Sequence, residues 1–299
     1  MGYKMKAIYH LPGLFEFYDL YRAFLPLFRE HRDWFYPWCG IGSIYGAPAD
    51  CLWGGGRVGF GEDRAEDAAA LMAEYGVSAR LTFSNSLLEP EHLADRKCNA
   101  LCRLFEKSRV PSGVILHSDL LLDYLRQNYP GFYFVSSTTK VLTEFAQLEA
   151  ELGRPEFSFV VPDFRLNKSF DRLRALPAAK KQKVEFLCNE CCWFRCPDRR
   201  ACYEAVSRKS LGLDAEHRCA SPHADRGYRF SDAMRNPGFI GIGDIQNTYL
   251  PLGFSHFKIE GRSLGSALIL EFLLYYLTKP EYQLNVREEI YLGSTLDLF

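Results

Sequence analysis

The sequence predicts an α/β protein, specifically a (β/α)8 TIM-type barrel with a cysteine-rich insertion after the seventh strand. Eight apolar runs of strand length alternate with amphipathic stretches of helix length along 299 residues, a usual length for one such barrel. The runs are rich in β-branched and aromatic residues without alternation, as in parallel strands buried on both faces. No repeat, low-complexity tract or linker divides the chain. A doubly wound open sheet is the alternative architecture.

Each strand is expected where an apolar run is bounded by polar or turn-forming residues. The expected strands span residues 5–10, 40–45, 79–83, 114–117, 132–136, 157–161, 184–188 and 254–259. The helices are expected near residues 14–32, 63–75, 91–107, 120–127, 140–151, 168–176 and 265–277. Ser118 is expected to cap the helix that follows the fourth strand. We therefore expect a single barrel domain over residues 1–299, with an insertion at 197–250 that carries part of a metal site.

Composition and charge narrow the classes of function. Hydrophobic residues make up 47% of the chain and aromatic residues 15%, which permits a large core and excludes wholesale disorder. The formal net charge of −1 argues against binding nucleic acid or membrane through the bulk electrostatic field. The N-terminus lacks the features of a signal peptide, and the longest apolar run, Ala267–Leu277, is too short to span a bilayer. These features predict a cytoplasmic protein.

The segment from Val184 to Cys219 holds six of the ten cysteines. Four of them, Cys192, Cys196, Cys202 and Cys219, are spaced Cys-x3-Cys-x5-Cys-x16-Cys. Thiols this dense in a chain without an export signal usually bind a metal or perform redox chemistry. We expect these four to hold a 4Fe–4S cluster, which prefers soft thiolate ligands. Structural zinc is the alternative, although its loops usually form two matched pairs, and unligated buried thiols are a third possibility.

Three other cysteines are expected to be structural. Cys98 and Cys102 lie four residues apart on one predicted helix, a spacing that places both on its buried face. Cys188 should point away from Asn189 and toward the surrounding helices if strand alternation persists.

Polar residues that follow the predicted strands should meet at the C-terminal face, where barrels of this type carry their catalytic groups. The catalytic candidates are His117, Asn189, Glu260 and Arg262. His117 is the only histidine at a predicted strand end on this face and is the candidate proton carrier. Arg262 can hold a carboxylate or phosphate, and Glu260 can orient it or handle a proton. Asn189 and Glu190 lie between the seventh strand and the thiols.

A glycine run, Gly54–Gly59, matches Gly-x-Gly-x-x-Gly and precedes a predicted helix. A dinucleotide-binding fingerprint would follow a buried strand directly, but Ala47–Asp50 interrupts the approach. We therefore expect a tight turn at the barrel mouth, because glycine adopts conformations that other residues avoid. Arg57 within this run could receive an anionic group.

Three segments resemble motifs of the collagenase-like peptidase family, peptidase family U-32. Val184–Arg199 is similar to the cysteine motif that follows a barrel strand in that family. Leu252–Arg262 ends in Lys-Ile-Glu-Gly-Arg and resembles the family's second hallmark, and Val135–Thr138 resembles its Ser-Thr strand end. The resemblance implies a TIM-type barrel and, in several members, a 4Fe–4S cluster held by four cysteines. The family's cysteine positions correspond to Cys192, Cys196 and Cys219.

The resemblance also implies a reaction. Better-understood members support oxygen-independent hydroxylation of ubiquinone precursors or of tRNA and rRNA bases. We therefore expect an iron–sulfur hydroxylase-like enzyme with an aromatic or nucleobase substrate, either a small molecule or RNA, and with an electron donor or protein partner. The alternatives are a peptidase, as the family name suggests, and a non-catalytic cluster or zinc protein within a larger complex. The fourth cluster ligand stays open between Cys202, Cys51 and Cys191.

Overall fold

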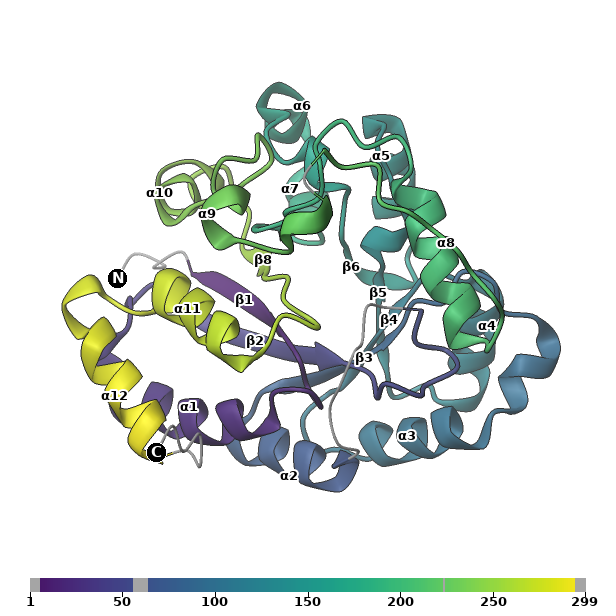
Figure 1. The fold of residues 1–299 in the computed structure, drawn as a ribbon, viewed down its shortest axis with the longest axis horizontal. Coiled ribbons are helices and arrows are strands. Elements are labelled where there is room, and N and C mark those ends of the chain that lie inside the picture. Colours follow the sequence, from purple (N-terminus) through teal and green to yellow (C-terminus); the bar gives the residue numbers. More distant parts are fainter. Residues whose placement is uncertain (1–5, 56–63, 223, 294–299) are drawn as a thin grey trace.

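The structure, a computed structural model, describes residues 6–55, 64–222 and 224–293. Within these residues, eight parallel strands form one sheet that curls into a barrel (Figure 1). Their order is β6-β5-β4-β3-β2-β1-β8-β7. The strands are β1 Ala7–Pro12, β2 Cys39–Gly46, β3 Ser78–Phe83, β4 Gly113–Leu116, β5 Tyr133–Ser136, β6 Phe157–Val160, β7 Glu185–Leu187 and β8 His256–Lys258.

The ring is nearly closed between β6 and β7. Val160 and Val184 form a parallel bridge, and the Val160 N–H donates to the Lys183 carbonyl at 2.8 Å. All other neighbouring strands pair in parallel along their length. The predicted (β/α)8 TIM-type barrel is confirmed.

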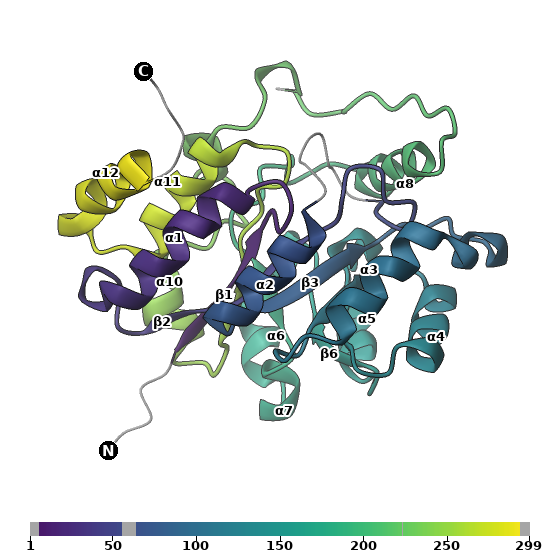
Figure 2. The ribbon, with the colours of Figure 1, turned by 90° about the horizontal axis from the view of Figure 1, so that it is seen from below.

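Helices surround the strands (Figures 1 and 2). They are α1 Tyr18–Glu30, α2 Ala65–Tyr75, α3 Arg96–Glu106, α4 Asp119–Asn128, α5 Phe145–Leu152, α6 Phe170–Ala175, α7 Ala178–Lys181, α8 Arg199–Ser210, α9 Phe230–Ala233, α10 Ile242–Asp244, α11 Ser266–Leu277 and α12 Gln283–Gly293. The last helix, α12, packs against α11 and against the first helix, α1. None of the helices in the described ranges is long and apolar enough to cross a membrane.

The core has two parts because strand side chains alternate between the helices and the barrel interior. A large apolar cluster fills the space between sheet and helices and includes Tyr9, Leu81 and Phe186. A small inner cluster lies inside the barrel, toward its C-terminal end. The inner cluster consists of Tyr45, Ile115, Val135, Val161 and Leu187. It forms the apolar wall of the barrel mouth.

The segment between β7 and β8 carries α8, α9 and α10 and contains the predicted insertion at 197–250. Its first helix, α8, docks on the loop after β3. Asn85 Nδ2 donates to the Ser207 carbonyl at 3.2 Å, and the Ser86 N–H donates to Ser207 Oγ at 3.1 Å. This contact holds α8 beside the loop after β3, at the C-terminal end of the barrel (Figure 2).

Several helices begin later than the sequence predicts. α1 starts at Tyr18 rather than near Leu14, because Gly13 adopts a φ of +88° and a turn follows it. α5 starts at Phe145 rather than near Lys140, because Val141 lies in the left-handed region at φ 52°. A backbone excursion of this kind leaves little trace in hydrophobic periodicity, so the pattern places the helix start too early.

The turn predicted at the glycine run is partly described. Gly55 has φ +60°, and a Cβ there would come within 2.4 Å of the Asn85 backbone. Glycine is therefore required both for its conformation and for the close approach. Arg57 and the rest of the run lie outside the described residues.

Candidate active site

A cavity of about 90 Å³ opens at the C-terminal ends of the strands. One water needs roughly 10–15 Å³ on a comparable measure, so the cavity has room for a small molecule or a few waters. The inner apolar cluster forms part of its wall. Its polar lining includes Thr82, Thr138, Thr139, Glu190, Lys258, Glu260 and Arg262. Catalytic groups occupy this position in barrels of this type.

Lys258 comes from the last residue of β8 and points into the barrel, since its neighbours Phe257 and Ile259 pack in the helix-facing core. Its Nζ lies 3.5 Å from Glu185 Oε1 and 3.5 Å from the centroid of the Tyr45 ring. Burial lowers the pKa of Lys258 to about 8, assisted by Arg80 and opposed by Glu185. The amine therefore exchanges its proton near neutral pH.

A charged network fills the barrel below Lys258. Arg80 Nη1 donates to Glu185 Oε2 at 2.5 Å, and His10 Nε2 lies 3.5 Å from the same oxygen. Burial alone would raise the pKa of Glu185, but Arg80, His10 and Lys258 together hold it well below its usual range. Burial and the nearby Arg80 lower the pKa of His10 well below its ordinary value. Glu185 is therefore a permanent anion that faces two cations, Arg80 of β3 and Lys258 of β8, with the His10 ring of β1 beside it.

The histidines extend this network across β1, β2 and β8. His10 Nδ1 lies 2.8 Å from Ser43 Oγ, and His10 Nε2 lies 3.1 Å from His256 Nδ1. Burial lowers the pKa of His256 to about 4, although Glu185 opposes the shift. Both rings are therefore neutral at pH 7.

Arg262 follows the end of β8, and an ion pair with Glu16, which lies between β1 and α1, holds its side chain. Its Nε pairs with Glu16 Oε1 at 3.4 Å. Burial raises the pKa of Glu16 even though Arg262 opposes the shift. In the described part of the chain, four buried hydrogen-bond donors on cavity-lining residues have no acceptor. They are Thr82 Oγ1, Thr138 Oγ1, Lys258 Nζ and Arg262 Nη2.

Asn189 does not line the cavity but fixes a residue that does. Its Oδ1 accepts from the Glu260 N–H at 2.7 Å, and its Nδ2 donates to the Glu260 carbonyl at 3.0 Å. Asn189 Nδ2 also donates to Tyr228 Oη at 3.2 Å. The side chain thus ties the end of β7 to the end of β8 and sets the backbone that presents Glu260.

His117 does not line the cavity but contacts a residue that does. Its Nδ1 is 2.9 Å from Oγ1 of Thr139, which does line the cavity. Burial lowers the pKa of His117 to about 4, assisted by Lys140 and Arg200. Of the four predicted catalytic residues, Glu260 and Arg262 reach the cavity, whereas Asn189 and His117 contact it through other residues.

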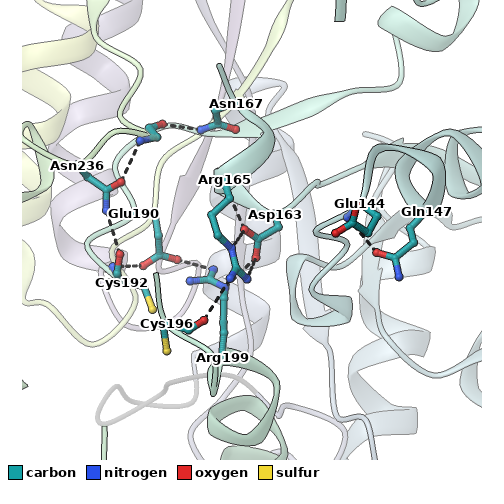
Figure 3. A network of polar contacts seen from close by, with 11 residues as sticks. Glu144, Gln147, Asp163, Arg165, Asn167, Glu190, Cys192, Cys196, Arg199 and Asn236 are labelled. Carbon is teal, nitrogen blue, oxygen red and sulfur yellow. Dashed lines mark hydrogen bonds and ion pairs between the residues drawn. The ribbon is translucent and has the colours of Figure 1, made fainter. Parts of the chain in front are cut away.

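The cysteine segment is held by two buried carboxylates and two arginines (Figure 3). Glu190 accepts from the Cys192 N–H at 2.9 Å and from Arg199 Nη2 at 2.6 Å. Arg199 Nε lies 3.3 Å from Asp163 Oδ2, and Arg165 Nη1 donates to the Cys196 carbonyl at 3.2 Å. The loop after β7 is therefore anchored to the loop after β6.

The four predicted cluster ligands lie in different environments. Cys196 is buried, Cys192 and Cys202 are half-buried, and Cys219 is exposed. Burial raises the pKa of the Cys192 thiol to about 12, and Glu190 adds to the shift. Across the described residues, no three His, Cys, Asp or Glu side chains are grouped so that they could hold a metal ion. In this arrangement the four thiols do not fit a cluster.

A hollow of about 660 Å³ separates the cysteine loop from the chain that follows Cys219. Cys191 and Cys192 line one side of it, and Ser221, two residues after Cys219, lines the other. The space between the cysteine loop and Ser221 is therefore open rather than packed.

The remaining cysteines belong to the core, as predicted for Cys98, Cys102 and Cys188. All three are buried in the large apolar cluster. Cys51, an alternative fourth ligand, is also buried, and its Sγ lies 3.2 Å from Sγ of Cys98.

Sequence reasoning missed the charged network inside the barrel. Lys258, Glu185 and Arg80 each interrupt an apolar strand at a position whose neighbours face the helices. The signal was present, because a charge between two core residues of a strand must point into the barrel. The apolar residues on both sides of each charge make the strand resemble a continuous apolar run, which conceals this signal.

No protein-family model matches the chain, and no curated protein matches its sequence. Among solved structures, the chain is similar to the U32 peptidase Mk0906, with a TM-score of 0.51 and 14% sequence identity. The match covers 87% of this chain and 95% of that one. The chain has the fold of a U32 peptidase. At this identity the likeness shows the fold alone, and it agrees with the fold that the sequence resemblance implied.

Proposed function

We propose that this chain is an enzyme that binds a small anionic substrate at the mouth of its barrel. The observation that carries the proposal is the set of four hydrogen-bond donors without an acceptor on residues lining one cavity, two of them on Lys258 and Arg262. A buried polar group without a partner costs about 1–3 kcal/mol, more when it is charged. A carboxylate or phosphate in the cavity would satisfy both cations and accept from the two threonine hydroxyls.

The cavity residues supply binding and proton transfer. Arg262 offers a planar fork that suits a carboxylate or phosphate. Lys258, with a pKa of about 8, can take up or release a proton close to neutral pH. For the reaction we propose oxygen-independent hydroxylation, or a related redox modification, of an aromatic or nucleobase substrate. The support for this class is the set of three sequence segments that resemble the U-32 family, together with the barrel fold.

We also propose that the chain binds a 4Fe–4S cluster through Cys192, Cys196, Cys202 and Cys219, with zinc as the alternative metal. The support is the spacing of these cysteines and the open hollow between Cys192 and the chain after Cys219. Binding requires the segment around Cys219 to move across this hollow, since the described arrangement does not group the thiols.

Hydrolysis is the second candidate, and one contact favours it. Thr139 lines the cavity and lies 2.9 Å from His117, as a nucleophile and its base would. However, the Thr139 hydroxyl donates to Ser137 Oγ at 3.0 Å and so accepts from His117 rather than giving it a proton. A histidine with a pKa of about 4 is also a weak base at neutral pH. Peptidase activity therefore ranks second.

Substrate binding is tested with inorganic phosphate and benzoate as probes, measured by calorimetry. Arg262→Lys keeps the charge but loses the planar fork, so the dissociation constant for benzoate should rise roughly tenfold. Arg287→Lys is the matched control, because Arg287 pairs with both oxygens of Glu271 at 3.0 and 3.1 Å away from the cavity. Equal benzoate affinity in wild type and Arg262→Lys would remove Arg262 from the site.

Cluster binding is tested by anaerobic reconstitution with iron and sulfide, followed by metal analysis. A brown protein with about four irons is expected, and Cys192→Ala, Cys196→Ala and Cys219→Ala should each bleach it. Cys98→Ala and Cys102→Ala are the controls and should keep the colour. Stoichiometric zinc would favour the zinc alternative, and four irons in the triple variant would reject the ligand set.

A further inference from the structure

Lys258 lies in the mouth cavity and is only loosely paired with its nearest carboxylate. It lines the mouth cavity, its side chain is 7% exposed, and its Nζ has no hydrogen-bond partner in the described part of the chain. The nearest carboxylate oxygen, Glu185 Oε1, is 3.5 Å away, beyond the usual range of a hydrogen bond. A structural lysine inside a barrel would be expected to close this distance, because an unsatisfied buried ammonium is costly.

Lys258 shares its nearest carboxylate with another cation. Glu185 faces two cations, and Arg80 already holds its Oε2 at 2.5 Å. Arg262, the other cation near Lys258, pairs with Glu16. Tyr45 offers only its ring, since its hydroxyl donates to the Ile259 carbonyl at 2.6 Å. Arginine does not deprotonate in proteins, so Lys258 is the cation of this group that can give up its proton.

We propose that Lys258 forms a Schiff base with the carbonyl carbon of a small 2-oxo acid, whose carboxylate Arg262 holds. This inference goes beyond the proposed hydroxylation and rests on one part of the proposed function, the binding of an anion at the barrel mouth. A neutral lysine in a low-dielectric site beside another cation is the usual form of a Schiff-base lysine. The hydroxyls of Thr82 and Thr138, which also line the cavity, are available to bind the carbonyl oxygen.

The step needs no oxidant or reductant. The lone pair of neutral Nζ attacks the carbonyl carbon, and the carbonyl oxygen takes a proton to give a carbinolamine. The nitrogen then loses its second proton, the hydroxyl leaves as water, and a C=N bond remains. Amine and carbonyl thus give imine and one water. The cavity carboxyl of Glu260 is the candidate proton carrier.

The experiment is reductive trapping with pyruvate and cyanoborohydride, followed by mass spectrometry of the peptides. We expect the mass of one reduced pyruvate on Lys258, formed at least about tenfold faster than on Lys183, because burial increases the neutral fraction of the Lys258 amine at pH 7.5. The labelling rate should rise from pH 7 to 9 and then level. Lys258→Arg should abolish this adduct, whereas Lys183→Arg, a matched change outside the cavity, should leave it intact.

Lactate separates the two proposals, because it has the carboxylate of pyruvate but no carbonyl. If lactate binds and slows the labelling of Lys258, both proposals are supported. If lactate and pyruvate bind, as seen by ligand-observed NMR, but Lys258 is not labelled above Lys183, the Schiff base is rejected and anion binding stands. If neither acid binds and no selective label forms, both proposals fail for this class of substrate.

Discussion

Burial of the charged Lys258 amine should lower the stability of the folded protein, and replacing the residue should show by how much. Burial lowers its pKa to about 8, whereas the pKa in the unfolded chain is about 10.4. Below pH 8 both states hold the proton, and the folded state bears the whole cost of burying it. Between pH 8 and 10 the folded state has released the proton, so the wild type gains stability as the pH rises.

The variant Lys258→Met should therefore be more stable than the wild type at pH 7, by about 1–3 kcal/mol. The advantage should shrink as the pH rises from 8 to 10, because methionine does not titrate. Urea unfolding at pH 7 and pH 10 measures both values. Lys168→Met, which removes a half-exposed pair with Asp244, should change stability by less than about 1 kcal/mol at either pH. A variant less stable than the wild type at pH 7 would mean that the Glu185 interaction outweighs burial.

At the residue scale, the sequence predicted which end of the barrel carries the cavity better than it predicted which residues line that cavity. Glu260 and Arg262 were predicted from their place after a strand, and both reach the cavity. Asn189 and His117 were predicted by the same rule, yet they act through hydrogen bonds to neighbours. Strand-end position fixes the face of the barrel on which a residue lies. It does not fix whether the side chain turns to the cavity or to an adjacent loop.

The strand ends β7 and β8 form a unit that Asn189 holds together. Its fully buried side chain makes two hydrogen bonds to the backbone of Glu260. Oδ1 accepts from the N–H at 2.7 Å, and Nδ2 donates to the carbonyl at 3.0 Å. Asn189→Ala would leave the Glu260 N–H and carbonyl without these partners. The expected loss is about 2–4 kcal/mol of unfolding free energy, from two buried groups at about 1–3 kcal/mol each.

Chemical denaturation measures this loss. Asn128→Ala serves as the control, since its exposed side chain bonds only the Tyr124 carbonyl at 2.8 Å, and it should stay within about 0.5 kcal/mol of the wild type. Asn189→Ala should also weaken benzoate binding, because Glu260 and the following turn would lose their fixed position. Wild-type stability in Asn189→Ala would show that another contact joins β7 to β8.

At the element scale the strands were predictable and the helix starts were not. A buried parallel strand is a short apolar run, and each predicted run overlaps the observed strand. The start of α5 depends instead on Val141. Its backbone is left-handed, and no pattern of residues in the sequence predicts this. The residues before α1 depend in the same way on Gly13, which is one glycine among 23 in the chain.

For the whole molecule, the barrel follows from the order of its elements, whereas the metal site does not. Alternating strands and helices leave few ways to bury every strand on both faces. The cysteine positions instead depend on the path of a long segment between β7 and β8. This segment is fixed near Glu190 and Arg199, but Cys219 is exposed beyond α8. Spacing in sequence specifies a ligand set only where the intervening chain has a defined path.

The buried histidines should make the whole fold sensitive to mild acid. The pKa of His117 and that of His256 are lowered to about 4, mainly by burial, and that of His10 is lowered well below its ordinary value. In the unfolded chain each histidine titrates near 6.5. As the pH falls below 6.5 the unfolded state binds three protons that the folded state does not, so the free energy of unfolding falls.

From pH 7 to 5.5 we expect a loss of about 1 kcal/mol for each of the three histidines, about 3–4 kcal/mol together. Glu185 does not contribute in this range, because its pKa lies well below its usual value and it stays ionised in the folded protein. Urea unfolding at the two pH values measures the loss. His256→Asn should reduce it by about one third, since asparagine removes one titrating group from the interior, whereas an unchanged pH dependence in that variant would show that His256 is protonated inside the folded barrel.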